Sequence, residues 1–278
     1  MNRISMLLAI SYGVLIVSGC GTNEEVADWN NAIKLDPSNA LAYYNRGVSY
    51  YARGETEKAL ADYNKAIELN PKYASAYVNR GSIYDRRGET EKALADCNKA
   101  IELDPSFALA YNNRGRIYQL RGETEKALAD YNKAIKLDPS LALAYNNRGR
   151  NYYRHGETEK ALADYNKAVE LDPSIAGTYI NRGRIYHLLG EEEKAIADSS
   201  KAIELDPSIA IAYINRGRIY QLRGETEKAI ADYNKAIELD PSIAGTYIIR
   251  GSAYKDLGKT EKAKLDFDKA KELGYEPE

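Results

Sequence analysis

The sequence predicts an all-α protein, an elongated solenoid of tandem helical hairpins, and three observations support this fold class. Prolines recur every 34 residues, at Pro37, Pro71, Pro105, Pro139, Pro173, Pro207 and Pro241. The fifteen residues Asn113–Ala127 (NRGRIYQLRGETEKA) return letter for letter at Asn215–Ala229. Each period also contains two stretches whose apolar residues follow helical spacing. A fixed period of this length is typical of stacked supersecondary units.

The composition narrows the class of protein. The 278 residues are 44% hydrophobic and 29% charged, which excludes a disordered chain. A formal net charge of −2 gives no general attraction to nucleic acid or to anionic membranes. Any electrostatic recognition therefore has to come from local patches.

The N-terminal segment "MNRISMLLAISYGVLIVSGCG" predicts a secretory signal peptide over residues 1–19. Its apolar run, Ile4–Val17, is shorter than the ~20 residues that a membrane-spanning helix needs. The stretch from Val17 to Cys20 resembles the lipobox of bacterial lipoproteins, in which cleavage leaves a lipidated cysteine as first residue. We therefore expect lipidation at Cys20 and a position in the bacterial cell envelope, anchored to a membrane and facing the periplasm or exterior. The alternative is an ordinary signal peptide that ends in a chance cysteine.

Residues 25–39 match only the second half of a repeat, which predicts an N-terminal capping helix behind a short tether at residues 20–24. Val26 and Ile33 are expected to pack on the first complete repeat. If Cys20 carries lipid, Cys97 has no disulfide partner. Cys97 stands where other repeats have tyrosine, so a small buried apolar residue is favoured over a reactive thiol.

Residues 108–141 serve as the reference unit for the hairpin. The first helix should bury one arc and the second helix another, with Gly122 as the turn between them. Gly115 in mid-helix costs about 1 kcal/mol relative to alanine, so we expect a close approach of the partner helix there. Pro139 ends the second helix and fits the first turn of the next.

The pattern of this unit resembles the tetratricopeptide repeat, through Tyr111, Gly115, Tyr118, Ala127, Tyr131, Ala134 and Pro139. The resemblance implies a right-handed α-solenoid whose first helices line a concave surface. It covers seven repeats, 40–73, 74–107, 108–141, 142–175, 176–209, 210–243 and 244–273, followed by a tail at 274–278. Ser199 replaces the expected aromatic, which predicts a softer fifth repeat. Lys264 and Lys271 replace apolar residues and should end the array with a polar face.

No catalytic motif is present in the sequence. His155 and His187 lack a second histidine at metal-ligand spacing, and there is no Gly-rich phosphate loop. The glutamates of the "GETEK" strings complement the dipoles of the second helices. We therefore expect no enzymatic activity, no metal or other cofactor, no nucleic acid and no small-molecule substrate.

Polar columns on the first helices are the candidate binding residues. One column contains Asn113, Asn147, Asn181 and Asn215, and a second contains Arg116, Arg150, Arg184 and Arg218. Asparagine can bond an extended peptide backbone, and the guanidinium fork pairs with acidic groups. The alternative is a solvated face whose arginines pair with local glutamates.

A third column becomes apolar in the C-terminal half, at Ile180, Ile214 and Ile248. These residues either give the groove an apolar end for an anchor side chain or amphipathic helix, or pack between repeats. A further column, Arg46, Arg80, Arg114, Arg148, Arg182, Arg216 and Arg250, lies on the inward arc. We expect it to be structural, with the arginines packed against tyrosine rings.

The sequence thus predicts a membrane-anchored interaction scaffold that binds segments of partner proteins in a concave groove. The alternative is a module for an anionic glycan or other polymer in cell-wall building or polysaccharide export, held by the arginine column.

Overall fold

The computed structural model describes residues 21–276, and over that range it is entirely helical apart from turns. The chain divides into two units, Met1–Leu171 and Asp172–Glu278. The N-terminal unit contains α1 (Asn23–Leu35), α2 (Ala40–Ala52), α3 (Thr56–Leu69), α4 (Ala74–Arg86), α5 (Thr90–Leu103), α6 (Ala108–Leu120), α7 (Thr124–Leu137), α8 (Ala142–Arg154) and α9 (Thr158–Leu171). The C-terminal unit contains α10 (Ala176–Leu188), α11 (Glu192–Leu205), α12 (Ala210–Leu222), α13 (Thr226–Leu239), α14 (Ala244–Asp256) and α15 (Thr260–Glu272).

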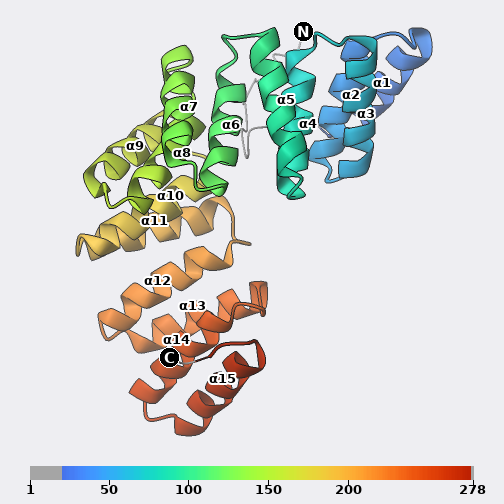
Figure 1. Cartoon of the computed structure of the whole chain (residues 1–278). Coiled ribbons are helices and arrows are strands. Elements are labelled where there is room, and N and C mark those ends of the chain that lie inside the picture. The colour runs from blue at the N-terminus through green and yellow to red at the C-terminus, as the bar shows by residue number, and fades with distance from the viewer. Residues whose placement is uncertain (1–20, 277–278) are drawn as a thin grey trace, which may run out of the picture. The chain divides into compact units, whose positions relative to one another are not determined.

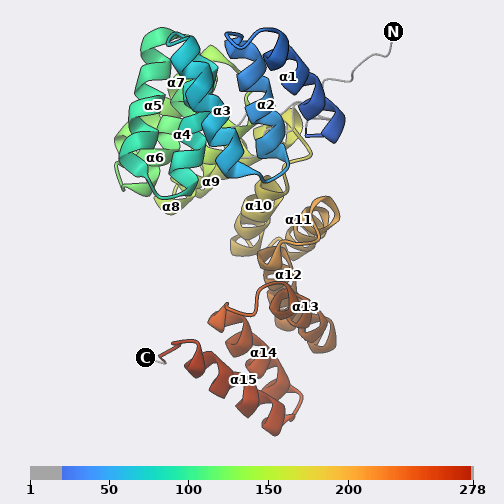
Figure 2. The same cartoon turned by 90° about the vertical axis from the view of Figure 1, so that its right-hand side faces the viewer.

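Within each unit, consecutive helices pair as antiparallel hairpins, and successive hairpins stack side by side (Figures 1 and 2). Each predicted repeat contains one hairpin, the first from α2 and α3 and the last from α14 and α15. The all-α solenoid predicted from the 34-residue period is therefore confirmed. The predicted signal peptide and Cys20 lie outside the described residues.

The capping helix α1 begins earlier than the sequence analysis predicted. Thr22 accepts a hydrogen bond from the backbone nitrogen of Glu25, and the Glu25 side chain bonds back to the backbone of Thr22. This capping box satisfies two donors at the helix start, so residues 23 and 24 are helical and do not belong to a tether. Val26 is buried as expected, whereas Ile33 is half-buried.

The turn inside each hairpin depends on a glycine. Between α6 and α7, Gly122 has a φ of 74°, in the left-handed region where a side chain is strained. At the end of the hairpin, Ser140 donates to Asp138 Oδ1 from its backbone nitrogen (2.9 Å) and from its hydroxyl (2.6 Å). These local bonds fix the connection to the next first helix.

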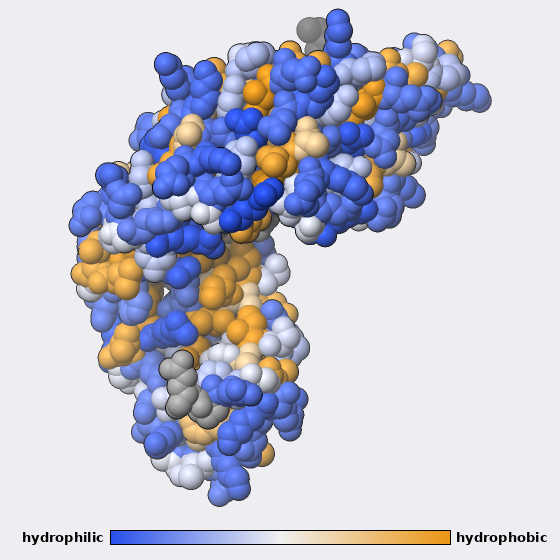
Figure 3. Space-filling view, in the orientation of Figure 1, coloured by the Kyte–Doolittle hydropathy of each residue, from blue (hydrophilic) through white to orange (hydrophobic). Residues whose placement is uncertain are grey.

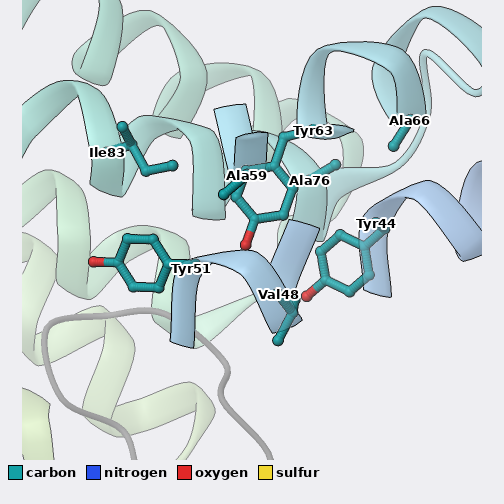
Figure 4. Packing of buried hydrophobic residues seen from close by; sticks show 8 residues of the cluster. All are labelled: Tyr44, Val48, Tyr51, Ala59, Tyr63, Ala66, Ala76 and Ile83. Atoms are coloured by element: carbon teal, nitrogen blue, oxygen red, sulfur yellow. The ribbon is translucent and has the colours of Figure 1, made fainter. Parts of the chain in front are cut away.

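Buried tyrosines from the second helices fill the core of most hairpins. Tyr63, Tyr131, Tyr165 and Tyr233 are almost completely buried. In the first hairpin, Figure 4 shows Tyr63 among Ala59, Ala66, Ala76 and Tyr44. A Cβ at Gly115 would lie 2.9 Å from the Tyr131 ring and 3.2 Å from the Ala127 carbonyl oxygen. The mid-helix glycine is thus explained by a tyrosine ring that packs directly on the helix backbone.

The inward arginine column is a structural clamp. In the third hairpin, Arg114 donates to both carboxylate oxygens of Asp130, at 2.7 and 2.8 Å, and to Asn98 Oδ1 of the preceding hairpin at 2.8 Å. Its guanidinium lies over the Tyr111 and Tyr118 rings, 5.5 and 5.8 Å from their centroids. The hydrogen bond to Asp130 is the main reason that the pKa of Arg114 is raised. The predicted packing against tyrosine is confirmed.

The same clamp recurs in every hairpin of the described chain. The pairs are Arg46–Asp62, Arg80–Asp96, Arg114–Asp130 and Arg148–Asp164 in the N-terminal unit, and Arg182–Asp198, Arg216–Asp232 and Arg250–Asp266 in the C-terminal unit. Sequence analysis missed the aspartate, although it stands sixteen residues after the arginine each time.

Cys97 is a buried, free thiol in the core of the second hairpin. Burial raises its pKa to about 12, so the thiol is neutral at pH 7. Its expected role as a small apolar residue is confirmed.

One buried polar residue interrupts the core. Asn151 stands where the neighbouring repeats have Ile117 and Ile185, is 1% exposed, and has no partner for either side-chain polar atom among the described residues. An unsatisfied buried amide costs roughly 1–3 kcal/mol. We therefore predict that Asn151→Ile raises the free energy of unfolding of the N-terminal unit by about that amount.

The measurement is the urea midpoint followed by circular dichroism, with Ile117→Asn as the reverse change one repeat earlier. Ile117→Asn should lower the midpoint. A lower midpoint for Asn151→Ile would contradict the prediction and show that the amide has a partner, such as a bound water.

Candidate functional site

The first helices of successive hairpins lie next to one another within each unit. Direct contacts join α4 to α6 and α6 to α8 in the N-terminal unit, and α10 to α12 and α12 to α14 in the C-terminal unit. Among the described helices, no two second helices of successive hairpins come as close. The first helices are thus on the inner side of each unit's curve. We call their exposed side the first-helix face of that unit.

The asparagine column is buried in the N-terminal unit, which corrects the prediction that it lines an open groove. Asn113 is 3% exposed and donates through Nδ2 to Ser82 Oγ at 3.0 Å. Asn147 is 6% exposed and donates to Asn112 Oδ1 at 2.9 Å. These amides join one first helix to the next, so they stabilise the stack instead of facing a peptide.

The arginines of the same unit are also engaged internally. Arg116 forms an ion pair with Asp85 of the preceding first helix. Arg150 donates to Gln119 Oε1 from Nη2 at 3.0 Å and from Nε at 3.3 Å. The alternative of pairing with local glutamates is therefore wrong in detail, because the acceptors are an aspartate and a glutamine on the neighbouring first helix.

In the C-terminal unit, the asparagine and arginine columns are more exposed to solvent than in the N-terminal unit. Arg184 and Arg218 are exposed, and Asn181 and Asn215 are half-buried. The Nδ2 atom of Asn215 is buried without a hydrogen-bond partner in the part of the chain that the structure describes. Of the predicted binding arginines, Arg184 and Arg218 are thus the exposed pair, whereas Arg116 and Arg150 are half-buried.

The isoleucine column mainly packs inside the C-terminal unit. Ile180 and Ile214 are buried and Ile248 is half-buried. Ile214 belongs to a core cluster with Tyr213 and Ala236. The packing alternative is therefore correct for Ile180 and Ile214, and their use as an exposed apolar groove is wrong.

The exposed apolar residues of this face are different ones, which the sequence analysis did not select. Leu188 and Leu222 are 60% and 67% exposed, and each follows an exposed arginine by four residues on the same helix. Ile211, at the start of α12, is also exposed. Figure 3 shows apolar side chains gathered around α12, whereas the visible side of the N-terminal unit is mainly hydrophilic. Leu188 and Leu222 occupy the same position in successive repeats, and this shared position is the sequence signal that could have identified them.

The first-helix faces offer guanidinium, amide and apolar groups, which can bind a partner molecule through hydrogen bonds, ion pairs and apolar contacts. In residues 21–276 no cluster of histidine, cysteine or acidic side chains could hold a metal ion. His187 lies on α10, where its Nδ1 atom is buried without a partner, and His155 bonds Thr124 and the backbone of α8.

Family profiles match most of the described chain. Tetratricopeptide repeat profiles match residues 40–73, 74–107, 210–243, 97–129 and 244–273, and a TPR repeat profile matches residues 23–54, 115–156, 149–190 and 183–224. The chain belongs to the tetratricopeptide repeat (TPR) family. Proteins of this fold are typically non-catalytic interaction scaffolds, and their partners are proteins.

Several solved TPR structures are similar to this TPR protein. MamA is 31% identical over 58% of this chain and 94% of its own, with a TM-score of 0.52. A chain of the APC/C hetero-tetramer Cut9–Hcn1 matches 83% of this chain at 18% identity, with a TM-score of 0.77. The present chain spans only 46% of the length of that chain. PilF from Pseudomonas aeruginosa matches at 23% identity over 69% of this chain and 88% of its own, with a TM-score of 0.64. The last two similarities show the fold alone.

A search of curated protein sequences finds no match to the chain. None of the helices among residues 21–276 is both long and apolar enough to cross a membrane.

Proposed function

We propose that this TPR protein is a non-enzymatic scaffold that binds segments of partner proteins on its first-helix faces, principally that of the C-terminal unit. One observation carries the proposal: on each of the neighbouring helices α10 and α12, an exposed leucine follows an exposed arginine by four residues. A charged group that fixes orientation beside an apolar contact is the usual composition of a peptide-binding surface. Membership of the TPR family supports the same class of function.

We further propose that the scaffold is attached to a membrane of the bacterial cell envelope through lipid on Cys20. The support is the lipobox-like stretch before Cys20 in the sequence. Metabolic labelling with an alkyne-tagged fatty acid tests the anchor. The wild-type chain should incorporate label and Cys20→Ser should not. Equal labelling of both would overturn the anchor and leave the scaffold proposal standing.

An anionic glycan or polymer as the ligand is the second candidate. The exposed Arg184 and Arg218, one repeat apart, favour this candidate. A long polymer would need more of the basic column, but Arg116 and Arg150 already pair with Asp85 and Gln119. Binding by several arginines should weaken steeply as ionic strength rises, and docking on Leu188 and Leu222 should not.

A crosslinked pull-down from native membranes tests the scaffold function. The variant Arg184→Glu with Arg218→Glu changes the face, and Lys201→Glu with Lys235→Glu makes the same charge change on the half-exposed lysines of α11 and α13. We expect the arginine variant to lose at least one dominant protein partner and the lysine variant to retain it. The same partners on both variants would contradict the proposal that this face recruits them.

A further inference from the structure

The helix α1 takes the place of a second helix in an incomplete hairpin. It lies at the outer end of the N-terminal unit, where α2 covers one of its sides (Figure 1). On that side it makes the contacts of a second helix, because Val26 is buried and Asn30 Oδ1 accepts from Arg46 of α2 at 2.8 Å. No described helix covers the side on which a first helix of the same hairpin would lie.

The uncovered side of α1 carries the residue types that complete hairpins use to hold their first helix. In the first hairpin, the Tyr63 ring packs on the backbone of α2, and Asp62 accepts both bonds of the arginine clamp. Thirty-four residues earlier, Trp29 and Asp28 stand at the positions of Tyr63 and Asp62. Both ingredients of the contact, an aromatic ring and a carboxylate, are therefore present on α1.

The exposure of these residues differs from that of their counterparts. Tyr63 is completely buried, whereas Trp29 is half-buried, and Leu35 at the end of α1 is 88% exposed. Asp28 is exposed and has no hydrogen bond or ion pair to any residue of the described chain. The clamp aspartates of the seven described hairpins are all buried. An apolar surface and an unpaired carboxylate thus lie together on one side of α1.

Glu25 stands where complete hairpins have a small alanine, Ala59 in the first of them, and could obstruct this side. Its carboxylate instead folds back to the start of the helix, where it accepts from the backbone nitrogens of Gly21 at 2.6 Å and Thr22 at 3.4 Å. The part of α1 that follows it, from Asp28 to Leu35, remains open to a docking helix.

We propose that this side of α1 binds an amphipathic helix of a partner protein, with an arginine of that helix paired to Asp28 and its apolar residues packed on Trp29 and Leu35. The arginine follows from charge complementarity within the chain itself, since an arginine holds the corresponding aspartate in all seven described hairpins. A helix laid on an apolar face is a common form of peptide recognition. The surface is separate from the first-helix faces and would add a second place of recruitment.

Other occupants fit this side of α1 less well. In the chain's own N-terminal segment, Tyr12 stands thirty-four residues before Arg46 and carries no positive charge for Asp28. Residues 1–19 are also the predicted signal peptide, which processing would remove. A second copy of the chain has no spare first helix among its described residues, because each one is already paired within its own hairpin.

A synthetic peptide that copies residues 40–52 serves as the probe on the full chain purified in detergent. It reproduces α2 with its clamp arginine, and an i,i+4 staple on its solvent side keeps it helical, because an isolated helix of this length is marginally stable. The anisotropy of a fluorescent label on the peptide reports binding. Replacing the peptide arginine by glutamine should weaken binding by about tenfold, through loss of the charge-assisted pair.

A double-mutant cycle locates the probe on α1. Asp28→Asn should weaken binding of the arginine peptide by about tenfold and should not weaken binding of the glutamine peptide further. Leu35→Ala should weaken binding of both peptides to the same extent. Glu68→Gln, the matched control, neutralises an exposed acid of α3, whose first helix is in place, and should leave binding unchanged. All three variants should keep the urea midpoint of the wild type.

No binding of the arginine peptide, or equal binding by Asp28→Asn and the wild type, would overturn the inference and leave the first-helix faces as the proposed site of recruitment. Two further results would overturn it by identifying another occupant. Binding of the probe to a chain without residues 1–19, and not to a chain that retains them, would assign this side of α1 to that segment. Self-association in sedimentation velocity that Asp28→Asn abolishes would assign it to a second copy.

Discussion

Replacing Arg114 by alanine is expected to lower the free energy of unfolding of the N-terminal unit by about 3 kcal/mol. The substitution removes both bonds to Asp130 and the bond to Asn98 of the preceding hairpin. Asp130 is 8% exposed at its side chain, so its carboxylate would remain buried without a counter-charge. A buried charge that loses its partner is far more costly than a broken pair on the surface.

The measurement is the urea midpoint of helical circular dichroism. Arg121→Ala is the control, because Arg121 pairs with Glu123 at the surface and should change stability by at most about 1 kcal/mol. Arg114→Lys keeps the charge and loses the fork, so it should lie between the two. Equal effects of Arg114→Ala and Arg121→Ala would show that the clamp does not hold adjacent hairpins together.

Gly217→Ala is expected to destabilise the C-terminal unit by about 2 kcal/mol, although alanine is the better helix former. A Cβ at this position would lie 2.6 Å from Cε1 of Tyr233, whose side chain is completely buried and has no room to move. The added methyl group must displace the ring or separate α12 from α13.

Gly183→Ala one repeat earlier is a matched control with the opposite expected sign. Ser199 replaces the tyrosine there, and the nearest atom to a new Cβ is Asp198 Cβ at 3.3 Å. The alanine should be accommodated and gain up to about 1 kcal/mol of helix propensity. Thermal unfolding of both variants measures the difference, and destabilisation by Gly183→Ala equal to that of Gly217→Ala would show that the tyrosine ring is not the cause.

The fold was predictable because every repeat contains the same helix and turn signals. The 34-residue period, the apolar arcs and the Asp-Pro-Ser breaks all indicate the same hairpin, and seven copies remove the ambiguity of any one. The start of α1 was missed because it depends on the capping box of Thr22 and Glu25, whereas α3, α5 and α7 begin without a side-chain cap hydrogen bond.

The candidate site was predicted less well, because helical spacing shows which residues share a face and does not show which of them the neighbouring helix covers. Asn113 and Arg116 lie on the expected side, yet Ser82 and Asp85 of the preceding first helix occupy their polar groups. The decisive information was the comparison between residues thirty-one and thirty-five positions apart, which follows from the stacking geometry. Once that geometry is known, Ile180 and Arg184 show that the C-terminal unit lacks the side-chain acceptors that the N-terminal unit supplies to its asparagines.

Site-specific photocrosslinking tests the central claim most directly, since it reports where a partner lies on the protein. A benzophenone amino acid at Leu188 places the crosslinker on the first-helix face, and the same residue at Glu204 places it on the exposed side of α11. Irradiation of cells should yield a discrete crosslinked protein from position 188 and none from position 204. Crosslinks confined to position 204, or equal at both, would contradict a scaffold that recruits its partners through the first helices.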